Sequence, residues 1–540
     1  MIRNMLEHYF VVFWALLGYC ALGVANIDNR YSHQLQHEIQ SDCHFTRYPS
    51  LCVQTLLALR PGSYHYTDVI SALVNKTIEE SKLPSSTSDD FSTLNSQLGA
   101  EAAKSAQSIT GDCEALMSLS VKRLRQSLTA IKQSPTKKKE DIQTWLSAAL
   151  TFQQACKDSA DGLTLASQIS KKMSYLTELS SNALALTNRI TGSKSPEPFD
   201  AATHTARGRL KGQIFPKWVS PRDRKLLQST TINANAVVAQ DGSGNYKTIS
   251  EAIRAASGGR FVIYVKAGVY KEKIHASKDG ITLIGEGKYT TIITGDDSVA
   301  GGSSMPGSAT FTVTGDGFIA RDIGFHNTAG SQGEQALALY IASDHSALYR
   351  CSIAGYQDTL YALALRQFYR ECDIYGTVDF IFGNAAAVFQ KCNLALRRPS
   401  GANVILANGR SDPGQNTGFS VQNCQITASS EFSAVKHSYE SYLGRPWKAY
   451  SRAVVMQSNI DDAIEPRGWI EWPGYGSSVL KSLYFAEYAN VGPGAGTSQR
   501  VTWPGFHVIG VEDAEKFTVA NFIAGNSWLS STKVAFDSGL

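Results

Sequence analysis

The chain has little that would suit it to a membrane or to nucleic acid. Beyond the first 25 residues, no stretch of the 540-residue sequence is long and apolar enough to span a bilayer. No run rich in lysine and arginine is interleaved with aromatic residues, and the formal net charge is only +4, so nucleic acid is not an expected partner. Glycine is scarce early on: five glycines lie between Asn26 and Asp200, against 35 from Ala236 onward. This contrast indicates a boundary between two domains.

Further absences narrow the chemistry. The sequence has no Gly-x-Ser-x-Gly motif, which argues against a serine esterase of the α/β-hydrolase type. It shows no acidic cluster suited to calcium, and nothing among its 11 histidines marks a catalytic base. We therefore expect neither a metal nor a cofactor.

Residues 1–25 are typical of a secretory signal peptide. Arg3 gives a basic start, the run from Tyr9 to Ala25 is apolar, and Gly23-Val-Ala25 is a small-x-small cleavage site. An uncleaved anchor is the alternative. Secretion permits disulfides, and with Cys20 in the signal an even eight of the nine cysteines remain. Asn75-Lys-Thr77 is the predicted glycosylation site.

Residues 26–191 have the pattern of an all-α domain. Segments such as Thr67–Thr77 and Trp145–Gln153 carry apolar residues at i, i+3 and i+4, which predicts a bundle of about four long helices. Residues 192–228 form a linker with four prolines and many basic residues. Within it, Arg224-Lys-Leu-Leu227 has the character of a protease processing site.

From residue 229 to residue 540 the pattern changes to short strands. Runs such as Phe261–Val265 and Ile281–Ile284 are separated by glycine, asparagine or aspartate corners. The runs are too short and too closely spaced to have helices between parallel strands. A right-handed parallel β-helix is therefore the predicted architecture of this domain.

An internal repeat in this domain places two aspartates at equivalent positions. Cys351-Ser-Ile-Ala-Gly-Tyr-Gln-Asp358 is followed 21 residues later by Cys372-Asp-Ile-Tyr-Gly-Thr-Val-Asp379. In stacked coils, equivalent residues lie about 4.8 Å apart. Two carboxylates that close cannot both ionise cheaply, so one should hold a proton while the other stays charged. Such a pair supplies an acid and a nucleophile or base; a turn role for the repeated aspartate is the alternative.

The cysteines of the repeat should stack on neighbouring coils, because Cys392-Asn-Leu394 continues the ladder of Cys351 and Cys372. A Cys372–Cys392 disulfide is predicted. Cys351–Cys372 and Cys392–Cys424 compete with it.

Five motifs in the second domain resemble, in their order, the five signatures of plant pectin methylesterases: Gly268-Val-Tyr-Lys-Glu272, Gln335-Ala-Leu-Ala-Leu339, Gln357-Asp-Thr-Leu360, Asp379-Phe-Ile-Phe-Gly383 and Leu443-Gly-Arg-Pro-Trp447. The first domain, with Cys43/Cys52 and Cys113/Cys156, is similar to the pectin methylesterase inhibitor domain. The whole resembles a type I precursor, with a signal, an inhibitor-like pro-region, a processing site and a catalytic β-helix.

The resemblance implies a role for each polar site residue. Asp379 would be the nucleophile that attacks the methyl-ester carbonyl of a galacturonosyl residue. Asp358 would protonate the departing methanol and then activate water. Gln335 and Gln357 would donate hydrogen bonds to the oxyanion. Arg445 would keep Asp379 ionised.

The resemblance also implies the substrate contacts and the partners. Trp447 and Tyr361 would face the sugar rings, Phe382 and Tyr442 would line the groove, and Gln335 and Arg445 would also bind substrate. The substrate would be methyl-esterified homogalacturonan in the cell wall. Implied protein partners are a subtilisin-like processing protease and a proteinaceous pectinesterase inhibitor. Cys43–Cys52 and Cys113–Cys156 would be disulfides of the pro-region.

The sequence departs from the family pattern at two places and leaves two other functions open. Met305-Pro306 replaces a threonine and an aromatic residue, and Asn408 stands where glutamine is usual. Two carboxylates about 5 Å apart would also suit a retaining glycosidase, as in polygalacturonase-like β-helices. The other alternative is a binding protein that acts through its N-terminal bundle as an inhibitor.

Overall fold

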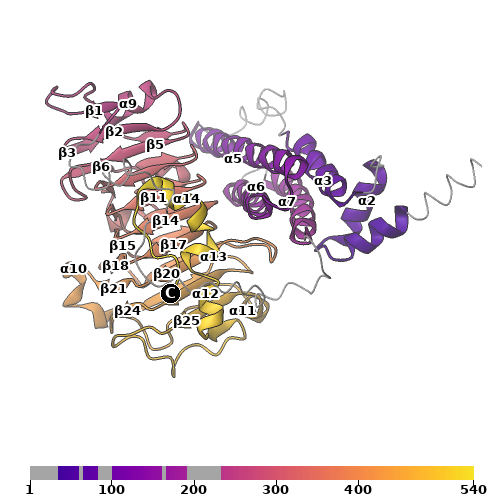
Figure 1. Ribbon diagram of the computed structural model, residues 1–540. Helices are drawn as coiled ribbons and strands as arrows, with labels where there is room; N and C mark the ends of the chain where they lie inside the picture. Colours follow the sequence, from indigo (N-terminus) through magenta and orange to yellow (C-terminus); the bar gives the residue numbers. More distant parts are fainter. Residues whose placement is uncertain (1–34, 60–64, 83–99, 161–165, 191–232) are drawn as a thin grey trace, which may run out of the picture.

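The computed structural model describes two domains, a helical bundle and a tall stack of strands (Figure 1). The described residues are 35–59, 65–82, 100–160, 166–190 and 233–540. The predicted signal peptide and the Arg224-Lys225 processing site lie outside them. Within these ranges, none of the helices is both long and apolar enough to cross a membrane.

The first domain confirms the predicted all-α class. Four helices pack side by side in a bundle, with the shorter α2 at one end: α2 (Pro49–Leu59), α3 (Tyr66–Glu80), α5 (Ala100–Gln133), α6 (Lys139–Ser159) and α7 (Ala166–Asn188). Their apolar faces bury one core, which includes Leu73, Leu124, Leu146 and Leu179.

The bundle contains two disulfides and the predicted glycosylation site. Cys43 is bonded to Cys52, and Cys113 of α5 is bonded to Cys156 of α6, which ties these two helices together. Asn75 is exposed on α3, while the Thr77 hydroxyl is buried and donates to a backbone carbonyl one turn earlier. Glycosylation at Asn75 stays a prediction.

The second domain is a parallel β-helix, as predicted. Each coil supplies one strand to each of three sheets, and every named strand pair is parallel. The seven-stranded sheet, called the groove sheet below, contains β4 (Ile274–Ala276), β7 (Phe311–Val313), β10 (Leu339–Ile341), β13 (Leu360–Ala362), β16 (Ile381–Gly383), β19 (Asn403–Asn408) and β22 (Ser441–Pro446).

The other two sheets complete the coils. The eleven-stranded sheet contains β1 (Ala236–Val238), β2 (Phe261–Val265), β5 (Ile281–Ile284), β8 (Ile319–Arg321), β11 (Ser346–Tyr349), β14 (Arg366–Arg370), β17 (Ala386–Gln390), β20 (Gly418–Gln422), β23 (Arg452–Met456), β25 (Tyr484–Tyr488) and β26 (Phe506–Val508). The eight-stranded sheet contains β3 (Gly268–Lys271), β6 (Thr291–Gly295), β9 (Gly324–Asn327), β12 (Ser352–Ala354), β15 (Asp373–Gly376), β18 (Asn393–Leu396), β21 (Gln425–Ala428) and β24 (Asn459–Ile460).

Alternation along the groove sheet separates an inner from an outer face. On β10 and β13, Leu339, Ile341 and Leu360 belong to the interior core of the β-helix, whereas Tyr340 and Tyr361 belong to a different apolar cluster. Successive side chains of a strand point to opposite faces, so the two tyrosines face outward. The outer face of this sheet is therefore aromatic.

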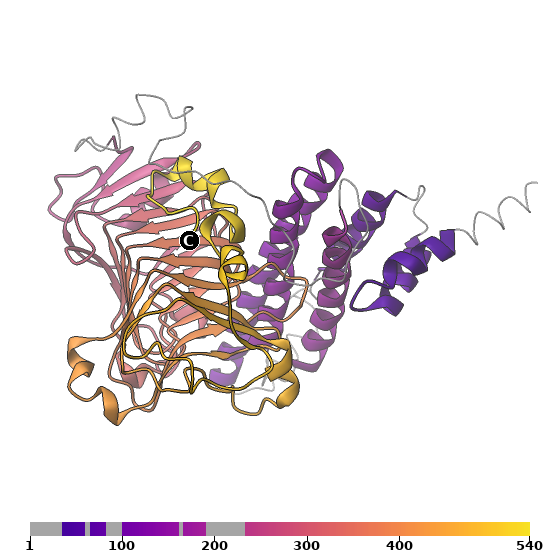
Figure 2. The ribbon, with the colours of Figure 1, turned by 60° about the horizontal axis from the view of Figure 1, so that its bottom comes forward.

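Short helices close the stack. Helix α9 (Ile249–Ala255) begins where the Glu272 carboxylate accepts hydrogen bonds from the backbone of Ile249 and Ser250, at 2.9 and 3.0 Å. The glutamate of the first signature thus has a capping role. The C-terminal helices α12 (Val511–Glu515), α13 (Val519–Phe522) and α14 (Gly525–Thr532) pack on the eleven-stranded sheet (Figure 2).

The four cysteines of the second domain lie buried in the interior, and the structure keeps all of them as free thiols. The predicted Cys372–Cys392 disulfide is therefore not formed in it. Each of these two cysteines precedes a strand of the eight-stranded sheet, and its thiol donates to a backbone carbonyl two residues back, at 3.4 Å for Cys372 and 3.6 Å for Cys392. Stacking also leaves Cys372 with a cysteine on each neighbouring coil, so the fold favours no single pair.

The glycine that ends β16 allows a testable prediction. Gly383 has φ of 122°, and a Cβ there would lie 2.1 Å from the Ala362 carbonyl oxygen of the adjacent coil. Gly383→Ala should therefore destabilise the β-helix by about 3 kcal/mol or more, measured by calorimetry of the full chain. Gly401→Ala is the matched control, because nothing lies within 4 Å of a Cβ there. Equal melting of the two variants would contradict the strain argument.

Candidate active site

An aromatic ladder forms the floor of the candidate site on the outer face of the groove sheet. The rings of Tyr340 and Tyr361 stack with centroids 5.1 Å apart, and those of Tyr361 and Phe382 stack at 4.3 Å. Trp447 meets Phe382 edge-on at 5.9 Å. Trp447 also rests on Gly409, where a Cβ would lie 2.7 Å from the indole. Three of the four predicted aromatic contacts thus lie together.

The paired aspartates occupy equivalent corners of neighbouring coils. Asp358 lies between β12 and β13 with φ of 59°, and Asp379 lies between β15 and β16 with φ of 50°. The Asp358 N–H donates to the Val378 carbonyl at 3.0 Å, so the two corners are in register. The left-handed backbone is unusual for a residue with a side chain. The residues are only 9% and 5% exposed.

Arg445 reaches this pair from β22, two strands further along the groove sheet. Its Nε lies 2.9 Å from Asp379 Oδ1 and its Nη2 lies 2.6 Å from Oδ2, which is a two-point, charge-assisted contact. The intervening position on β19 is Ala407, which pairs with both Phe382 and Arg445. Its small side chain leaves room for the long guanidinium group.

The electrostatics of the pair are asymmetric. Burial raises the pKa of Asp358 well above its usual range, and the neighbouring Asp379 carboxylate raises it further. Burial also raises the pKa of Asp379 above its usual range, but the hydrogen bond and the positive charge of Arg445 offset part of that rise. Asp358 is thus the group that holds the proton, and Asp379 is the group that stays ionised.

Two glutamines complete the polar groups of the site. Gln335 and Gln357 occupy adjacent coils and form a parallel bridge through their backbones. Both are half-buried, and in the described part of the chain neither side-chain amide has a hydrogen-bond partner. Both amides can therefore donate to an oxygen atom brought into the site.

Tyr442 and Asn408, which the sequence analysis also named, do not line the aromatic floor. Tyr442 is on β22, but its hydroxyl donates to Glu440 at 3.0 Å and its ring is outside the apolar cluster that holds Tyr361 and Phe382. Asn408 is buried; its amide donates to the Gly383 carbonyl, and its side-chain oxygen accepts from the backbone of Arg452. The shorter amide is thus bonded through both its nitrogen and its oxygen.

One aromatic contact was missed by the sequence analysis. The guanidinium carbon of Arg445 lies 4.2 Å from the centroid of the Trp472 ring, which is a cation–π contact. Trp472 belongs to none of the five motifs. The sequence shows Trp472 only as one of the tryptophans after the last motif, with nothing to indicate that it contacts Arg445.

The helical domain covers the groove. Residues of α5 and α6, including Met117 and Phe152, share one apolar cluster with Tyr340, Tyr361 and Phe382. Beside the aspartate pair, Asp158 of α6 forms a 2.7 Å ion pair with Lys448, and Thr151 accepts a hydrogen bond from Asn384. Figure 2 shows these helices lying along the stack of strands. Met305, from the Met305-Pro306 pair that departs from the family pattern, packs against this same cluster.

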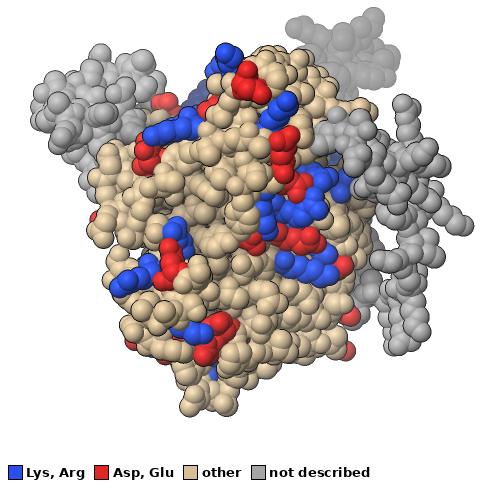
Figure 3. Space-filling view, turned by 90° about the vertical axis from the view of Figure 1, so that its left-hand side faces the viewer, with Lys and Arg blue, Asp and Glu red and all other residues tan. Residues whose placement is uncertain are grey.

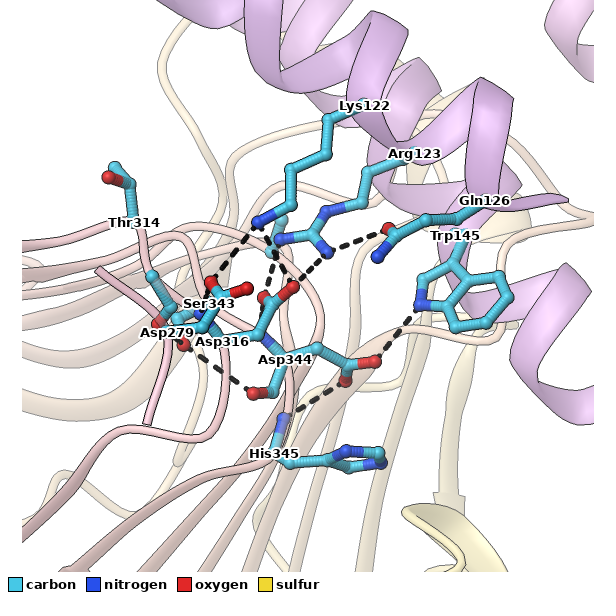
Figure 4. Close-up of polar contacts among 12 residues, drawn as sticks. Lys122, Arg123, Gln126, Trp145, Asp279, Thr314, Asp316, Ser343, Asp344 and His345 are labelled. Carbon is cyan, nitrogen blue, oxygen red and sulfur yellow. Dashed lines mark hydrogen bonds and ion pairs between the residues drawn. The ribbon is translucent and has the colours of Figure 1, made fainter. Parts of the chain in front are cut away.

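A second, ionic contact joins the domains away from the aspartate pair (Figure 4). Arg123 of α5 is fully buried and makes two bonds of 2.7 Å to Asp316, and Lys122 lies 3.1 Å from the same carboxylate. On the next coil, Asp344 accepts from the Trp145 indole of α6 at 3.1 Å. Burial alone would raise the pKa of Asp344, but the Arg366 guanidinium holds it well below its usual range.

The side of the β-helix shown in Figure 3 is different in character. Lysines and arginines lie next to aspartates and glutamates there, without a broad area of one sign. Ion pairs of the β-helix such as Lys288–Asp373 and Arg350–Asp322, at 2.6 and 2.7 Å, bring opposite charges together in the same way.

The fold and the site define a hydrolase with a paired-aspartate centre, and comparison with known proteins gives its family. The pectinesterase family model matches residues 235–526, and that of plant invertase/pectin methylesterase inhibitors matches residues 37–186. The chain belongs to the pectinesterase family and carries an N-terminal domain of the inhibitor family. It is a carboxylic ester hydrolase, and neither a β-helix glycosidase nor a simple binding protein is favoured.

Individual relatives agree with this family assignment. The chain is 49% identical to probable pectinesterase/pectinesterase inhibitor 54 of Arabidopsis thaliana, over 97% of this chain and 98% of that protein. It is 48% identical to pectinesterase 2 of Citrus sinensis, over 84% and 89%. The solved pectin methylesterase from carrot is 51% identical, with a TM-score of 0.56, and matches 58% of this chain and 100% of its own. That share is about the size of the β-helical domain, so the solved chain of this relative holds the β-helix without a matched helical domain.

The two-point contact of Arg445 with Asp379 allows a prediction. Lysine offers a compact charge in place of a planar fork. Arg445→Lys should lower kcat/KM for methanol release by about 10- to 100-fold, the equivalent of about 1.5–3 kcal/mol for a hydrogen bond to a charged group. The assay uses residues 229–540.

The matched control is Arg350→Lys, which breaks the same fork geometry with Asp322 at a corner outside the groove. Its kcat/KM should equal that of the parent. A similar loss in both variants would mean that the effect is on folding.

Proposed function

We propose that this chain hydrolyses the methyl esters of galacturonosyl residues in homogalacturonan, using Asp379 as nucleophile and Asp358 as general acid and base. The observation that carries the assignment is the asymmetry of the pair, because Arg445 contacts only one of the two carboxylates. The family and the relatives support the substrate class, since the relatives are named pectinesterases.

The first half-reaction forms an acyl-enzyme. The ionised Asp379 carboxylate attacks the ester carbonyl carbon, and the carbonyl oxygen becomes an oxyanion. The amides of Gln335 and Gln357 donate to that oxygen, a contribution of about 2.7–4 kcal/mol when one such donor is removed elsewhere. The protonated Asp358 gives its proton to the methoxy oxygen, and methanol leaves. The product is an anhydride between Asp379 and the sugar.

The second half-reaction restores the enzyme. Asp358, now a carboxylate, takes a proton from water while the hydroxyl oxygen attacks the galacturonosyl carbon of the anhydride. The bond to Asp379 breaks, and that carboxylate returns to its contact with Arg445. The galacturonate leaves as a carboxylate after losing its remaining proton to solvent. Each aspartate ends in its starting state, as a catalytic cycle requires.

The aromatic ladder supplies the surface for the polymer. Stacked rings offer a flat apolar face to the sugar rings, and Trp447 stands beside the corner that bears Asp379. Methyl-esterified units are uncharged, which suits a floor that contains tyrosine and phenylalanine. De-esterified units carry a negative charge and stack less favourably on it.

The helical domain acts as an intramolecular inhibitor in this proposal. Its α5 and α6 occupy the aromatic ladder that the substrate needs. The linker with Arg224-Lys-Leu-Leu227 is where a subtilisin-like protease would separate the two domains, and the mature enzyme would act in the cell wall after secretion. A free proteinaceous inhibitor of the same helical class would use the same groove. The relatives named as both pectinesterase and inhibitor support this pairing.

The nucleophile assignment gives a direct test. Asp379→Asn should abolish methanol release from esterified pectin by residues 229–540, because an amide cannot form the anhydride. Asp358→Asn should lower turnover by about 10²- to 10⁴-fold, the usual contribution of a general acid and base. Asp373→Asn, on β15 but outside the groove, should behave as the parent. Near-normal turnover in the Asp379 variant would exclude the covalent mechanism.

The inhibitor role gives a second test. A full chain in which alanine replaces Arg224 and Lys225 should stay uncut and release little methanol. Adding Arg123→Ala and Asp158→Ala should restore activity without cleavage, because both residues hold the helical domain on the β-helix. Lys172→Ala, whose partner Glu80 lies within the helical domain, is the control and should restore none. High activity of the uncut chain itself would refute the inhibition.

A further inference from the structure

The Arg445 guanidinium is held on an edge and on a face by different residues. Its edge makes the two-point contact with Asp379, at 2.9 and 2.6 Å. The Trp472 indole covers its plane at 4.2 Å. The Arg445 side chain is 19% exposed, so water has access to what these two contacts leave open.

The segment that carries Trp472 is fixed directly to the strand that carries Arg445. Gly444, the residue before Arg445, forms a bridge with Trp469, and its carbonyl accepts from the Ile470 N–H at 3.1 Å. On the other side, the Tyr475 hydroxyl donates to the Trp447 carbonyl at 2.7 Å. The segment is thus bonded to the chain on both sides of Arg445, at Gly444 of β22 and at Trp447 just after it.

The residue next to Trp472 adds a further anchor. The Glu471 carboxylate accepts from Arg467 at 2.7 and 2.8 Å and from the Trp503 indole at 3.2 Å. A turn then closes through the Tyr475 N–H, which donates to the Trp472 carbonyl. The ring is therefore supported by its own chain segment, independently of the arginine.

A ring face suits this position for a physical reason. The N–H donors of a guanidinium lie in its plane, so an indole stacked on that plane attracts the cation without competing for the donors. The ring excludes water from one face and opposes rotation of the group out of the plane of the carboxylate. An aliphatic side chain would exclude water but would lack the electrostatic attraction.

We propose that Trp472 is a positioning residue for the esterase reaction, whose indole ring holds the Arg445 guanidinium in the orientation that contacts both oxygens of Asp379. The inference rests on the proposed roles of Asp379 and Arg445. Trp472 itself need not touch the reacting atoms. It acts through the arginine.

The consequence is a specific change in pH dependence. Burial raises the pKa of Asp379 and the contact with Arg445 lowers it, so a loosened arginine lets that pKa rise. A nucleophile with a higher pKa is protonated at higher pH, and activity is then lost earlier on acidification. The other charged groups at the pair are Asp358 on the adjacent coil and, when the helical domain is docked, Asp158 with its partner Lys448.

The experiment compares Trp472→Leu and Trp472→Phe with the parent, in residues 229–540. The quantity measured is kcat/KM for methanol release as a function of pH, on both the acid and the alkaline limb of the profile. For the leucine variant we expect the acid limb to move upward by about half to one pH unit. The alkaline limb, set by Asp358, should move less, because Arg445 lowers the pKa of Asp358 through its charge alone, without a hydrogen bond. The phenylalanine variant keeps a ring face and should lie between leucine and parent. If the leucine variant does not fold, the phenylalanine variant decides by the same criterion.

Two further variants separate the alternatives. Trp447→Leu removes a ring proposed to face the sugar, and it should raise KM while leaving the acid limb in place. If Trp472→Leu does the same, Trp472 is a sugar contact and the inference is overturned. Asp379→Asn separates the inference from the mechanism: if it is inactive and the acid limb of Trp472→Leu coincides with that of the parent, only the positioning role fails. An active Asp379→Asn would remove the mechanism itself.

Discussion

The register between neighbouring coils is the constraint on which the site depends. The backbone bond from Asp358 to Val378 fixes the first aspartate directly beside the corner of the second. The groove then buries both carboxylates, and two buried like charges at one strand spacing cannot both ionise cheaply. A single arginine resolves this conflict by contacting only Asp379. The proposed acid and the proposed nucleophile thus differ by position alone, although both are aspartates.

The repeat was sufficient to predict this pair, because equivalent residues of successive coils stack whatever their side chains are. The helical and β-helical domains followed from periodicity and glycine content for the same reason. Trp472 could not be predicted, since its contact with Arg445 depends on how an irregular segment packs beside β22. The cysteine pairing could not be predicted from the ladder for a related reason: it makes Cys372 and Cys392 neighbours but gives Cys351 an equal claim, and the structure keeps all four cysteines as free thiols. Tyr442 shared a motif with the groove residues, yet its hydroxyl is bonded to Glu440.

The contact between the domains was also beyond the sequence. The helical pattern of α5 shows an apolar face, but not that Met117 meets an aromatic ladder or that the adjacent Arg123 is buried against Asp316. An outward-facing row of Tyr340, Tyr361 and Phe382 would otherwise be an exposed apolar surface, which soluble proteins keep small unless it binds something. The same physical property therefore suits the ladder to a sugar polymer and to a helix pair.

In the proposed function, the helical domain and the polymer compete for one surface, and the linker would determine which of them binds. A tether keeps the helical domain at an effective concentration that can reach the millimolar range, so modest contacts are enough to fill the groove. Cleavage changes none of these contacts; it removes only the tether. Separation must then expose Arg123 and Asp316 without their partners, which is costly for a buried charge until water replaces the lost bonds. A polymer binding at the ladder cannot supply those bonds, since Asp316 lies in the separate ionic contact. Under this proposal, release of the helical domain would depend on that ionic contact, while access of pectin would depend on the aromatic floor.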